Sequence, residues 1–535
     1  MTPGDGWIVF GAGGALMAAL LRGRALAAAV VALSILASLA YLLTFQYYTA
    51  DDAYIVARYA ANAVEIGQIV YNPGELINAV TTPLQLTVMI PLYAMVGAER
   101  LMGAYVLLCI ALCALVLAAL ARHFRHAPEA VALAFALIAA SPSLNLWLVG
   151  GLETPLLFAA VTLTVLIALR ADPCDDWRAG AAALLAGVGV LARYDAALFF
   201  APVLLSIWLR HPTPRRLLIM GALGAALPLT SLAFNWVYYG NLLPTSFYVK
   251  AESTPFRPVN LIYTSEFLWM SGVLLVIGGW ALVAAPLRAP RSAWRLRGAR
   301  SDPAQAVLIG LALMWGGYAA FFGTVHMMYG FRMYLPYLGA FALIAIGGLV
   351  NGLSHRPLPR LIPLLTAGVI ALHANGAFMQ ERVALDLARV GELRAVWDIP
   401  RYLDELAQAA ALVRSDWEAR GMTRRARIYS PNEGIAAYAA LDADVYGMLT
   451  RTRRGCPTEA RTLFEAMDYF IFEDFLLPYL YTERWTLDDL ELIGQGQLYR
   501  RNRDDGKTIA SVFVYRNPNP VPPTLTARFD EPCPG

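Results

Sequence analysis

Long apolar runs alternate with short polar segments through the first two-thirds of this 535-residue chain. An α-helix needs about 20 apolar residues to cross a bilayer core of about 30 Å. By this criterion the sequence predicts about eleven crossings. The predicted segments are 25–47, 101–121, 128–142, 155–170, 179–192, 195–210, 217–236, 264–287, 304–322, 333–350 and 361–379. The pattern is typical of a polytopic α-helical membrane protein.

Arginines gather in alternate loops and thereby predict the orientation, because cytoplasmic loops carry an excess of positive charge. The loops that we assign to the cytoplasmic side hold Arg22, Arg24, Arg122, Arg125, Arg170, Arg178, Arg210, Arg215, Arg216, Arg288, Arg291, Arg295, Arg297, Arg300, Arg356 and Arg360. This alternation requires that residues 83–97 do not cross. The segment is short and contains Pro91, so we interpret it as a juxtamembrane or re-entrant helix on the outer side.

Two further segments need interpretation. Residues 7–21 are apolar but lack a cleavage region, which favours a short interfacial or partly inserted helix over a signal peptide. Arg193, Tyr194 and Asp195 divide the run 179–210. They form either an ion pair at a tight outer hairpin or the apex of a V-shaped helix pair that frames a cavity.

Beyond residue 380 charged residues become frequent and spanning runs end. We therefore divide the chain into a membrane domain, 1–380, and a soluble α/β domain, 381–535, on the outer side. β-branched and aromatic residues predict strands at 425–430, 467–473 and 511–516, and apolar spacing predicts helices at 401–419 and 434–440. Cys456 and Cys533 fall in this domain, and whether they pair stays open.

Composition agrees with a membrane protein: 58% of residues are hydrophobic and 15% are charged. Soluble proteins carry about 25% charged residues. The formal net charge is +3, and the arginines lie in short clusters, so a nucleic-acid partner is excluded.

The segment 49–86 is the most polar part of the membrane domain and holds most candidate site residues. Asp51 and Asp52 directly follow an apolar run, and one of them can cap the next helix, which leaves the other unexplained. Arg58 and Asn62 share a helix face at i and i+4. The remaining candidates in this segment are Tyr59, Glu75 and Thr81. The alternative is a capped amphipathic helix lying at the membrane surface.

Residues 45–75 resemble the first outer loop of GT-C glycosyltransferases, and the similarity is greatest to the branch with the mycobacterial terminal arabinofuranosyltransferase. The matching residues are "DDAYI", "RY", the following Asn and "GQIVYNPGE". Weaker likeness extends to "GLETPLLF", "LARYDAAL", "NLLPTSFYVK", "YGFRMYLPYL" and "YSPNEGIAAYAALDADVYGMLTR". Tyr194–Asp195 and Asn78 depart from the pattern of relatives.

The resemblance implies a GT-C fold and transfer of a sugar, D-arabinofuranose, from a polyprenyl phosphate to an acceptor hydroxyl on the outer face of a bacterial plasma membrane. Asp51 or Asp52 would deprotonate the hydroxyl. Lys250, Arg332 and His326 would bind the donor phosphate, although snorkelling to lipid headgroups is an alternative for each. Glu153 and Arg193 are further substrate-binding candidates.

Phosphate-binding glycine loops, zinc spacings and the Gly-x-Ser-x-Gly motif are missing from the sequence, so nucleotide donors are disfavoured. We expect no cofactor, although a divalent metal beside Asp51 and Asp52 stays open. The partners implied are a decaprenyl-phosphate arabinofuranose type of donor, a glycan or glycoconjugate acceptor, and membrane lipids. Two alternatives remain: a mannose-type hexose transferase acting on protein or lipid, and a lipid-linked-sugar transporter, which would be expected to show inverted repeats.

Overall fold

A computed structural model gives the arrangement of the chain. It describes residues 11–17, 20–45, 48–170, 175–245, 247, 259–284, 302–321, 329–353, 361–387, 399–431, 433–447, 452–453, 456–457, 466–473, 490–498 and 510–518. Residues 7–10 and 18–19 of the segment 7–21 lie outside this part, and residues 11–17 are helical. Cys533 also lies outside it, so pairing with Cys456 stays untested.

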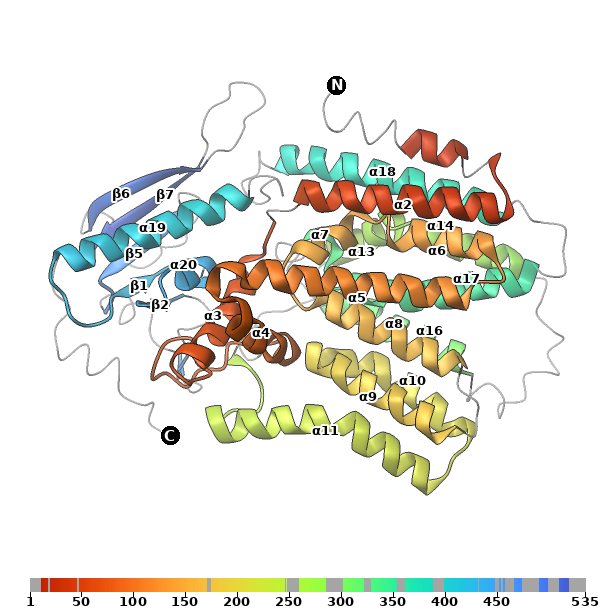
Figure 1. Ribbon diagram of the computed structural model, residues 1–535, viewed down its shortest axis with the longest axis horizontal. Coiled ribbons are helices and arrows are strands. Elements are labelled where there is room, and N and C mark those ends of the chain that lie inside the picture. Colours follow the sequence, from red (N-terminus) through yellow and green to blue (C-terminus); the bar gives the residue numbers. More distant parts are fainter. Residues whose placement is uncertain are drawn as a thin grey trace.

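In the described ranges the apolar segments predicted from the sequence are largely helical, although helix breaks interrupt 128–142 and 264–287. Residues 143–149, which no predicted segment includes, are helical as well. This part of the chain therefore contains the following apolar helices. They are α2 (Gly23–Phe45), α5 (Leu101–His123), α6 (Pro128–Ile138), α7 (Pro142–Val149), α8 (Thr154–Arg170), α9 (Asp176–Ala192), α10 (Ala197–Arg210), α11 (Pro214–Tyr239), α13 (Val259–Met270), α14 (Val273–Ala284), α16 (Pro303–Phe321), α17 (Leu338–Leu353) and α18 (Leu361–Leu387). The axes of many of these helices lie roughly parallel to one another, as expected of a membrane bundle (Figure 1).

Four helices in the described part of the chain are long and apolar enough to cross a membrane, or up to six if each bent pair counts as one span. The bent pairs are α6 with α7, at 58°, and α13 with α14, at 72°. Ser141 and Pro142 cause the first bend, because they end one helix and cap the next. The number of crossings predicted from the sequence therefore remains a prediction. Residues 83–97 form α4 (Pro83–Val96), whose 14 residues span about 21 Å and fall short of a bilayer core.

The run 179–210 is a helical hairpin. α9 ends at Ala192, a single turn of 3₁₀ helix (η2, Tyr194–Ala196) follows, and α10 then begins. Arg193 pairs with Asp195 across this turn, with Nη2 3.0 Å from Oδ2. The ion pair expected at a tight hairpin is therefore present. It lies at the end of the bundle that carries residues 48–82, which the sequence predicts to be the first outer loop.

Small residues allow the helices to pack closely. A Cβ on Gly187 of α9 would lie 2.6 Å from the Gly224 carbonyl oxygen of α11, and one on Gly339 of α17 would lie 2.0 Å from Thr162 Oγ1 of α8.

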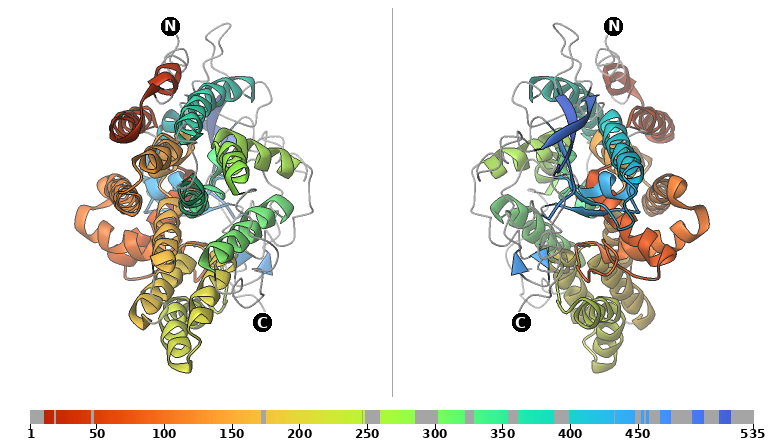
Figure 2. Two further views of the ribbon diagram at one scale, coloured as in Figure 1. Left: turned by 90° about the vertical axis from the view of Figure 1, so that its right-hand side faces the viewer. Right: turned by 90° about the vertical axis from the view of Figure 1, so that its left-hand side faces the viewer.

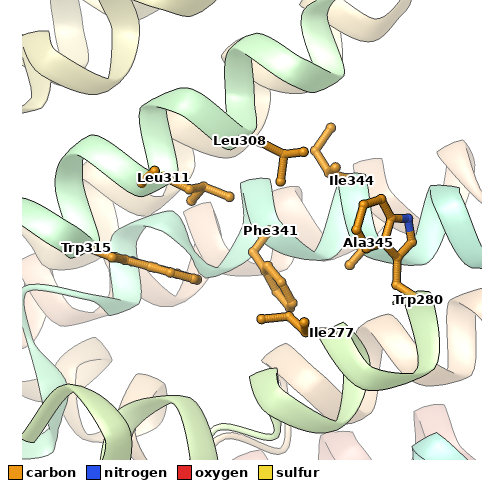
Figure 3. A pocket seen from close by; sticks show the side chains of 9 residues that line it. Ile277, Trp280, Leu308, Leu311, Trp315, Phe341, Ile344 and Ala345 are labelled. Atoms are coloured by element: carbon orange, nitrogen blue, oxygen red, sulfur yellow. The ribbon is translucent and has the colours of Figure 1, made fainter. Parts of the chain in front are cut away.

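Figure 2 shows the bundle viewed along the helix axes. An apolar pocket of about 270 Å³ lies between α14, α16 and α17 (Figure 3). Its lining includes Trp280 and Trp315.

The carboxyl-terminal part is the predicted α/β domain. Its sheet has the order β2-β1-β5-β7-β6, in which β1 pairs in parallel with β2 and β5, and β7 runs antiparallel to β5 and β6. The strands are β1 (Arg427–Tyr429), β2 (Asp444–Tyr446), β5 (Tyr469–Glu473), β6 (Glu491–Leu498) and β7 (Ala510–Arg516), and β3 (Thr452–Arg453) pairs separately with β4 (Cys456–Pro457).

Both predicted helices of this domain are confirmed, as α19 (Ile399–Ala419) and α20 (Glu433–Ala439). α19 packs along the sheet, while α20 lies between α19 and α3 (Asp51–Glu65) of the first outer loop (Figure 1). The domain is thereby joined to the loop that carries most of the candidate residues.

Candidate functional site

The site begins where α3 starts, beside the turn that precedes α8. The Ala50 N–H donates to the Gly150 carbonyl at 3.0 Å. Gly151 has φ +76°, and a Cβ there would lie 2.9 Å from Ala53 and 2.6 Å from Met102. Glycine is therefore required at this position both for its backbone and for space. The close approach brings the start of α3 next to Glu153.

Glu153 lies at the centre of a buried charge cluster. Its side chain is 1% exposed. Arg332 Nη2 donates to both of its oxygens, at 3.0 and 2.8 Å, and Arg193 Nη1 donates to Oε1 at 3.1 Å. Burial alone would raise the pKa of Glu153, but the two guanidinium groups outweigh burial and hold the pKa below its ordinary value. The carboxylate therefore stays ionised between two cations.

Arg332 connects Glu153 to the first outer loop. Its Nη1 lies 3.8 Å from Asp52 Oδ2, which is an ion-pair distance but too long for a direct hydrogen bond. The buried Nε has no hydrogen-bond partner among the described residues. Arg332 thus has N–H donors left over after binding Glu153, and the Asp52 side chain beside it is 38% exposed. This is the open part of the cluster.

The backbone before Arg332 adopts an unusual conformation. Gly330 has φ +63° and Phe331 has φ +59°, and a positive φ is uncommon for a phenylalanine. The Phe331 ring packs against Tyr263 and Phe267, at centroid distances of 5.1 and 5.7 Å, which holds it there. The guanidinium of Arg332 also lies 5.5 Å from the centroid of the Trp147 ring.

Asp195 continues the cluster on the other side of Arg193. The guanidinium donates to both Asp195 oxygens, from Nε at 3.1 Å and from Nη2 at 3.0 Å. The Tyr318 hydroxyl of α16 donates to Asp195 Oδ2 at 2.9 Å. Three carboxylates and two guanidinium groups from four separate segments therefore meet at this end of the bundle.

Asp51 differs from its neighbour Asp52. Its Oδ2 accepts the Gly434 N–H at 2.9 Å and its Oδ1 accepts the Ile435 N–H at 2.8 Å, so it caps the first turn of α20. Burial raises the pKa of Asp51 to about 6. The two backbone N–H bonds lower this pKa, and the nearby charge of Asp52 raises it further. The two aspartates are adjacent in sequence but have different partners.

Arg58 is fully buried, and all five of its N–H donors are used within the protein. Nε donates to the Tyr71 carbonyl, Nη1 to the carbonyls of Ala437 and Ala440, and Nη2 to Asn72 Oδ1 and the Ala443 carbonyl. The sequence suggests that Arg58 is a sugar ligand. In the structure its side chain instead joins the loop to the α/β domain.

The other loop candidates hold the loop itself. The Tyr59 hydroxyl donates to the Ile77 carbonyl and accepts the Ala79 N–H, and Asn62 Nδ2 donates to the carbonyls of Val70 and Tyr71. Glu75 Oε1 accepts from the Tyr446 hydroxyl at 2.7 Å. Thr81 is exposed. Tyr59, Asn62 and Glu75 are therefore engaged by the chain.

Lys250 and His326 lie outside the described residues, so their proposed contact with a phosphate stays a prediction. No group of three or more His, Cys, Asp or Glu side chains in the described ranges is placed to hold a metal ion. The sequence interpretation did not single out Trp147 or Tyr318. Aromatic residues near the outer ends of apolar segments are a weak signal for such roles, because they also anchor helices at interfaces.

Comparison with known proteins gives one curated relative. The chain is 29% identical over 293 residues to the "Terminal beta-(1->2)-arabinofuranosyltransferase" of Mycobacterium tuberculosis. The match covers 49% of this chain and 46% of the relative, so the similarity spans about half of each protein. No protein-family model matches.

Two solved structures are similar in outline. ArnT from Cupriavidus metallidurans, bound to undecaprenyl phosphate, has a TM-score of 0.49 at 14% identity, with 93% of this chain and 98% of that one covered. The arabinofuranosyltransferase AftD from Mycobacteria has a TM-score of 0.42 at 16% identity, with 94% and 40% covered. The curated relative confirms the resemblance seen in the sequence: this chain is similar to the mycobacterial terminal arabinofuranosyltransferase.

Proposed function

We propose that this chain is a membrane glycosyltransferase of the GT-C type that transfers a sugar, D-arabinofuranose, from a polyprenyl phosphate to an acceptor hydroxyl. The site faces the outer side of a bacterial plasma membrane, together with the α/β domain. The sugar is favoured by the similarity to the terminal arabinofuranosyltransferase, and the outer location is favoured by the distribution of arginines.

The observation that carries the proposal is the pair formed by Asp52 and Arg332. The partly exposed carboxylate of Asp52 lies 3.8 Å from the guanidinium of Arg332, whose buried Nε has no hydrogen-bond partner among the described residues. Transfer of a sugar from a phosphate ester requires both groups: an acceptor for the hydroxyl proton and a cation for the leaving phosphate. Glu153 binds Arg332 and is itself bound by Arg193.

In the proposed reaction the acceptor oxygen bonds to the anomeric carbon. The bond between that carbon and the phosphate oxygen breaks, and the electron pair leaves with the polyprenyl phosphate. Asp52 takes the hydroxyl proton, and Arg332 binds the phosphate as its charge develops. Lys250 and His326 remain candidates for the same phosphate, and Thr81 for the sugar. Asp51 is assigned to α20 rather than to the proton transfer, because both of its oxygens accept backbone N–H groups.

The test is a transfer assay with the purified protein and a panel of polyprenyl-phosphate sugars, including arabinofuranose and mannose, with product detection by mass spectrometry. Asp52→Asn should lower turnover 10²-fold or more. Asp442→Asn is the matched control, since its carboxylate lies in an exposed ion pair with Arg414 of the α/β domain. Transfer of mannose alone would change the sugar, and lack of transfer from every donor would refute the activity.

A further inference from the structure

The geometry between α3 and α20 assigns a role to two residues that the reaction does not use. We propose that Asp51 and Arg58 are positioning residues: they hold α20 of the α/β domain along α3 and thereby set the direction of Asp52. This inference rests on the proposed function for its link to Asp52, while the contact itself is independent of any activity.

Asp51 and Arg58 fit the two ends of α20. They are seven residues apart on α3, which places them on nearly the same helix face and about 10.5 Å apart along the axis. α20 also has seven residues, Glu433–Ala439, and is therefore about 10.5 Å long. The spacing of the two charged side chains matches the length of the helix that they contact.

The signs of the charges also fit. A helix carries partial positive charge at its N-terminus and partial negative charge at its C-terminus. The Asp51 carboxylate accepts the N–H groups of Gly434 and Ile435 at the first end. The Arg58 guanidinium donates to the carbonyls of Ala437, Ala440 and Ala443 at and beyond the second end. α3 thus supplies an anion and a cation where α20 needs each.

The start of α3 and the start of α20 are in close contact. A Cβ on Gly434 would lie 1.8 Å from the Asp51 carbonyl oxygen, so only glycine permits this approach. The Tyr71 hydroxyl donates to the Glu433 carbonyl, and Asn72 exchanges hydrogen bonds with the Val445 backbone at 3.0 Å in each direction. Loop and domain are therefore packed together as one unit around α20.

The contact bears on Asp52 because successive side chains on a helix point about 100° apart. With Asp51 fixed on α20, the first turn of α3 has one allowed rotation, and Asp52 then lies beside Arg332. If Asp51 is released, the first turn of α3 loses its attachment to α20, and Asp52 is held less firmly in line with Arg332. Loss of docking should therefore lower turnover without removing either catalytic group.

The experiment combines two readouts on the full-length protein. Hydrogen–deuterium exchange of the peptide that covers 433–440 reports docking and needs no substrate. Asp51→Ala and Gly434→Ala should each raise exchange in this peptide at least tenfold. Asp51→Asn should keep most of the protection, because the amide oxygen still accepts one of the two N–H groups. Gly347→Ala, at a helical glycine of α17 whose Cβ would meet nothing within 4 Å, controls for the addition of a methyl group away from this contact.

Turnover is the second readout, with polyprenyl-phosphate arabinofuranose as donor. We expect Asp51→Ala to lose about 10- to 100-fold in kcat and Asp51→Asn to lose no more than about fivefold, whereas Asp52→Asn loses 10²-fold or more. Unchanged exchange in both Asp51→Ala and Gly434→Ala would refute the docking role. An Asp51→Asn variant that is as inactive as Asp52→Asn, with normal exchange, would also refute it, because Asp51 would then take part in the chemistry. If the wild type transfers no sugar, the exchange experiment still decides the docking.

Discussion

Replacing Glu153 with glutamine tests whether the buried charge cluster supports Arg332. The carboxylate accepts three hydrogen bonds from two guanidinium groups, and its side chain is 1% exposed, so solvent does not screen the loss. Removing one partner of a buried ion pair costs roughly 3–5 kcal/mol. Glutamine keeps one accepting oxygen but places an NH₂ group against N–H donors. We therefore expect the free energy of unfolding to fall by about 3–5 kcal/mol.

Thermal unfolding in detergent, followed by tryptophan fluorescence, should show a midpoint lowered by roughly 3–5 °C. Binding of a non-transferable polyprenyl-phosphate analogue should weaken about tenfold or more, because Arg332 loses its anchor. Glu129→Gln is the control, since that carboxylate accepts one backbone N–H, from Gly23 at 2.9 Å. If Glu153→Gln and Glu129→Gln shift the midpoint equally, the cluster does not stabilise this end of the bundle as we argue.

Three further outcomes are expected. Arg332→Lys should keep part of the donor affinity while Arg332→Ala loses about 10- to 100-fold, because lysine retains the charge but not the planar fork; equal affinity in all three proteins would leave snorkelling as the better account. Gly339→Ala should destabilise the bundle by about 1–3 kcal/mol, since its Cβ would overlap Thr162, whereas Gly347→Ala meets nothing within 4 Å; equal melting of the two variants would contradict the packing. The pKa of Asp51 is raised to about 6, so between about pH 4 and pH 6 the folded state keeps a proton that the unfolded chain has lost. The stability of the wild type should therefore fall relative to Asp51→Asn as pH rises from about 4 to about 6. A difference in melting temperature that does not change with pH would show that the two N–H bonds cancel the effect of burial on this pKa.

The positions of most helices in the membrane domain could be predicted from the sequence, because each of these helices corresponds to a run of apolar residues. Short strands were harder. β2 has three residues and β6 carries two glycines, so neither has the β-branched pattern that marks a strand. Both segments form strands because they make backbone hydrogen bonds with a neighbouring strand, β2 with β1 and β6 with β7, and these pairings cannot be read from the local sequence.

The candidate residues could be found from the sequence, but their partners could not. Arg58 and Arg332 look alike as buried arginines near a polar loop. Only their surroundings distinguish them: all five donors of Arg58 are bound by the chain, and Arg332 keeps a buried Nε without a partner in the described residues. The contacts of Arg58 with Ala437, Ala440 and Ala443 join positions about 380 residues apart, which no local pattern reveals.

The distance along the chain between Arg58 and Ala443 also bears on how the protein is made. Arg58 leaves the ribosome 385 residues before Ala443, which at about 5–20 residues per second corresponds to roughly 20–80 s. A seven-residue helix such as α20 is unstable alone in water. Until it arrives, the guanidinium of Arg58 lacks three of its acceptors, and the first outer loop lacks its support. We therefore expect nascent chains to lack the proposed transfer activity until synthesis has passed α20, so that an unfinished chain would not consume the proposed lipid donor.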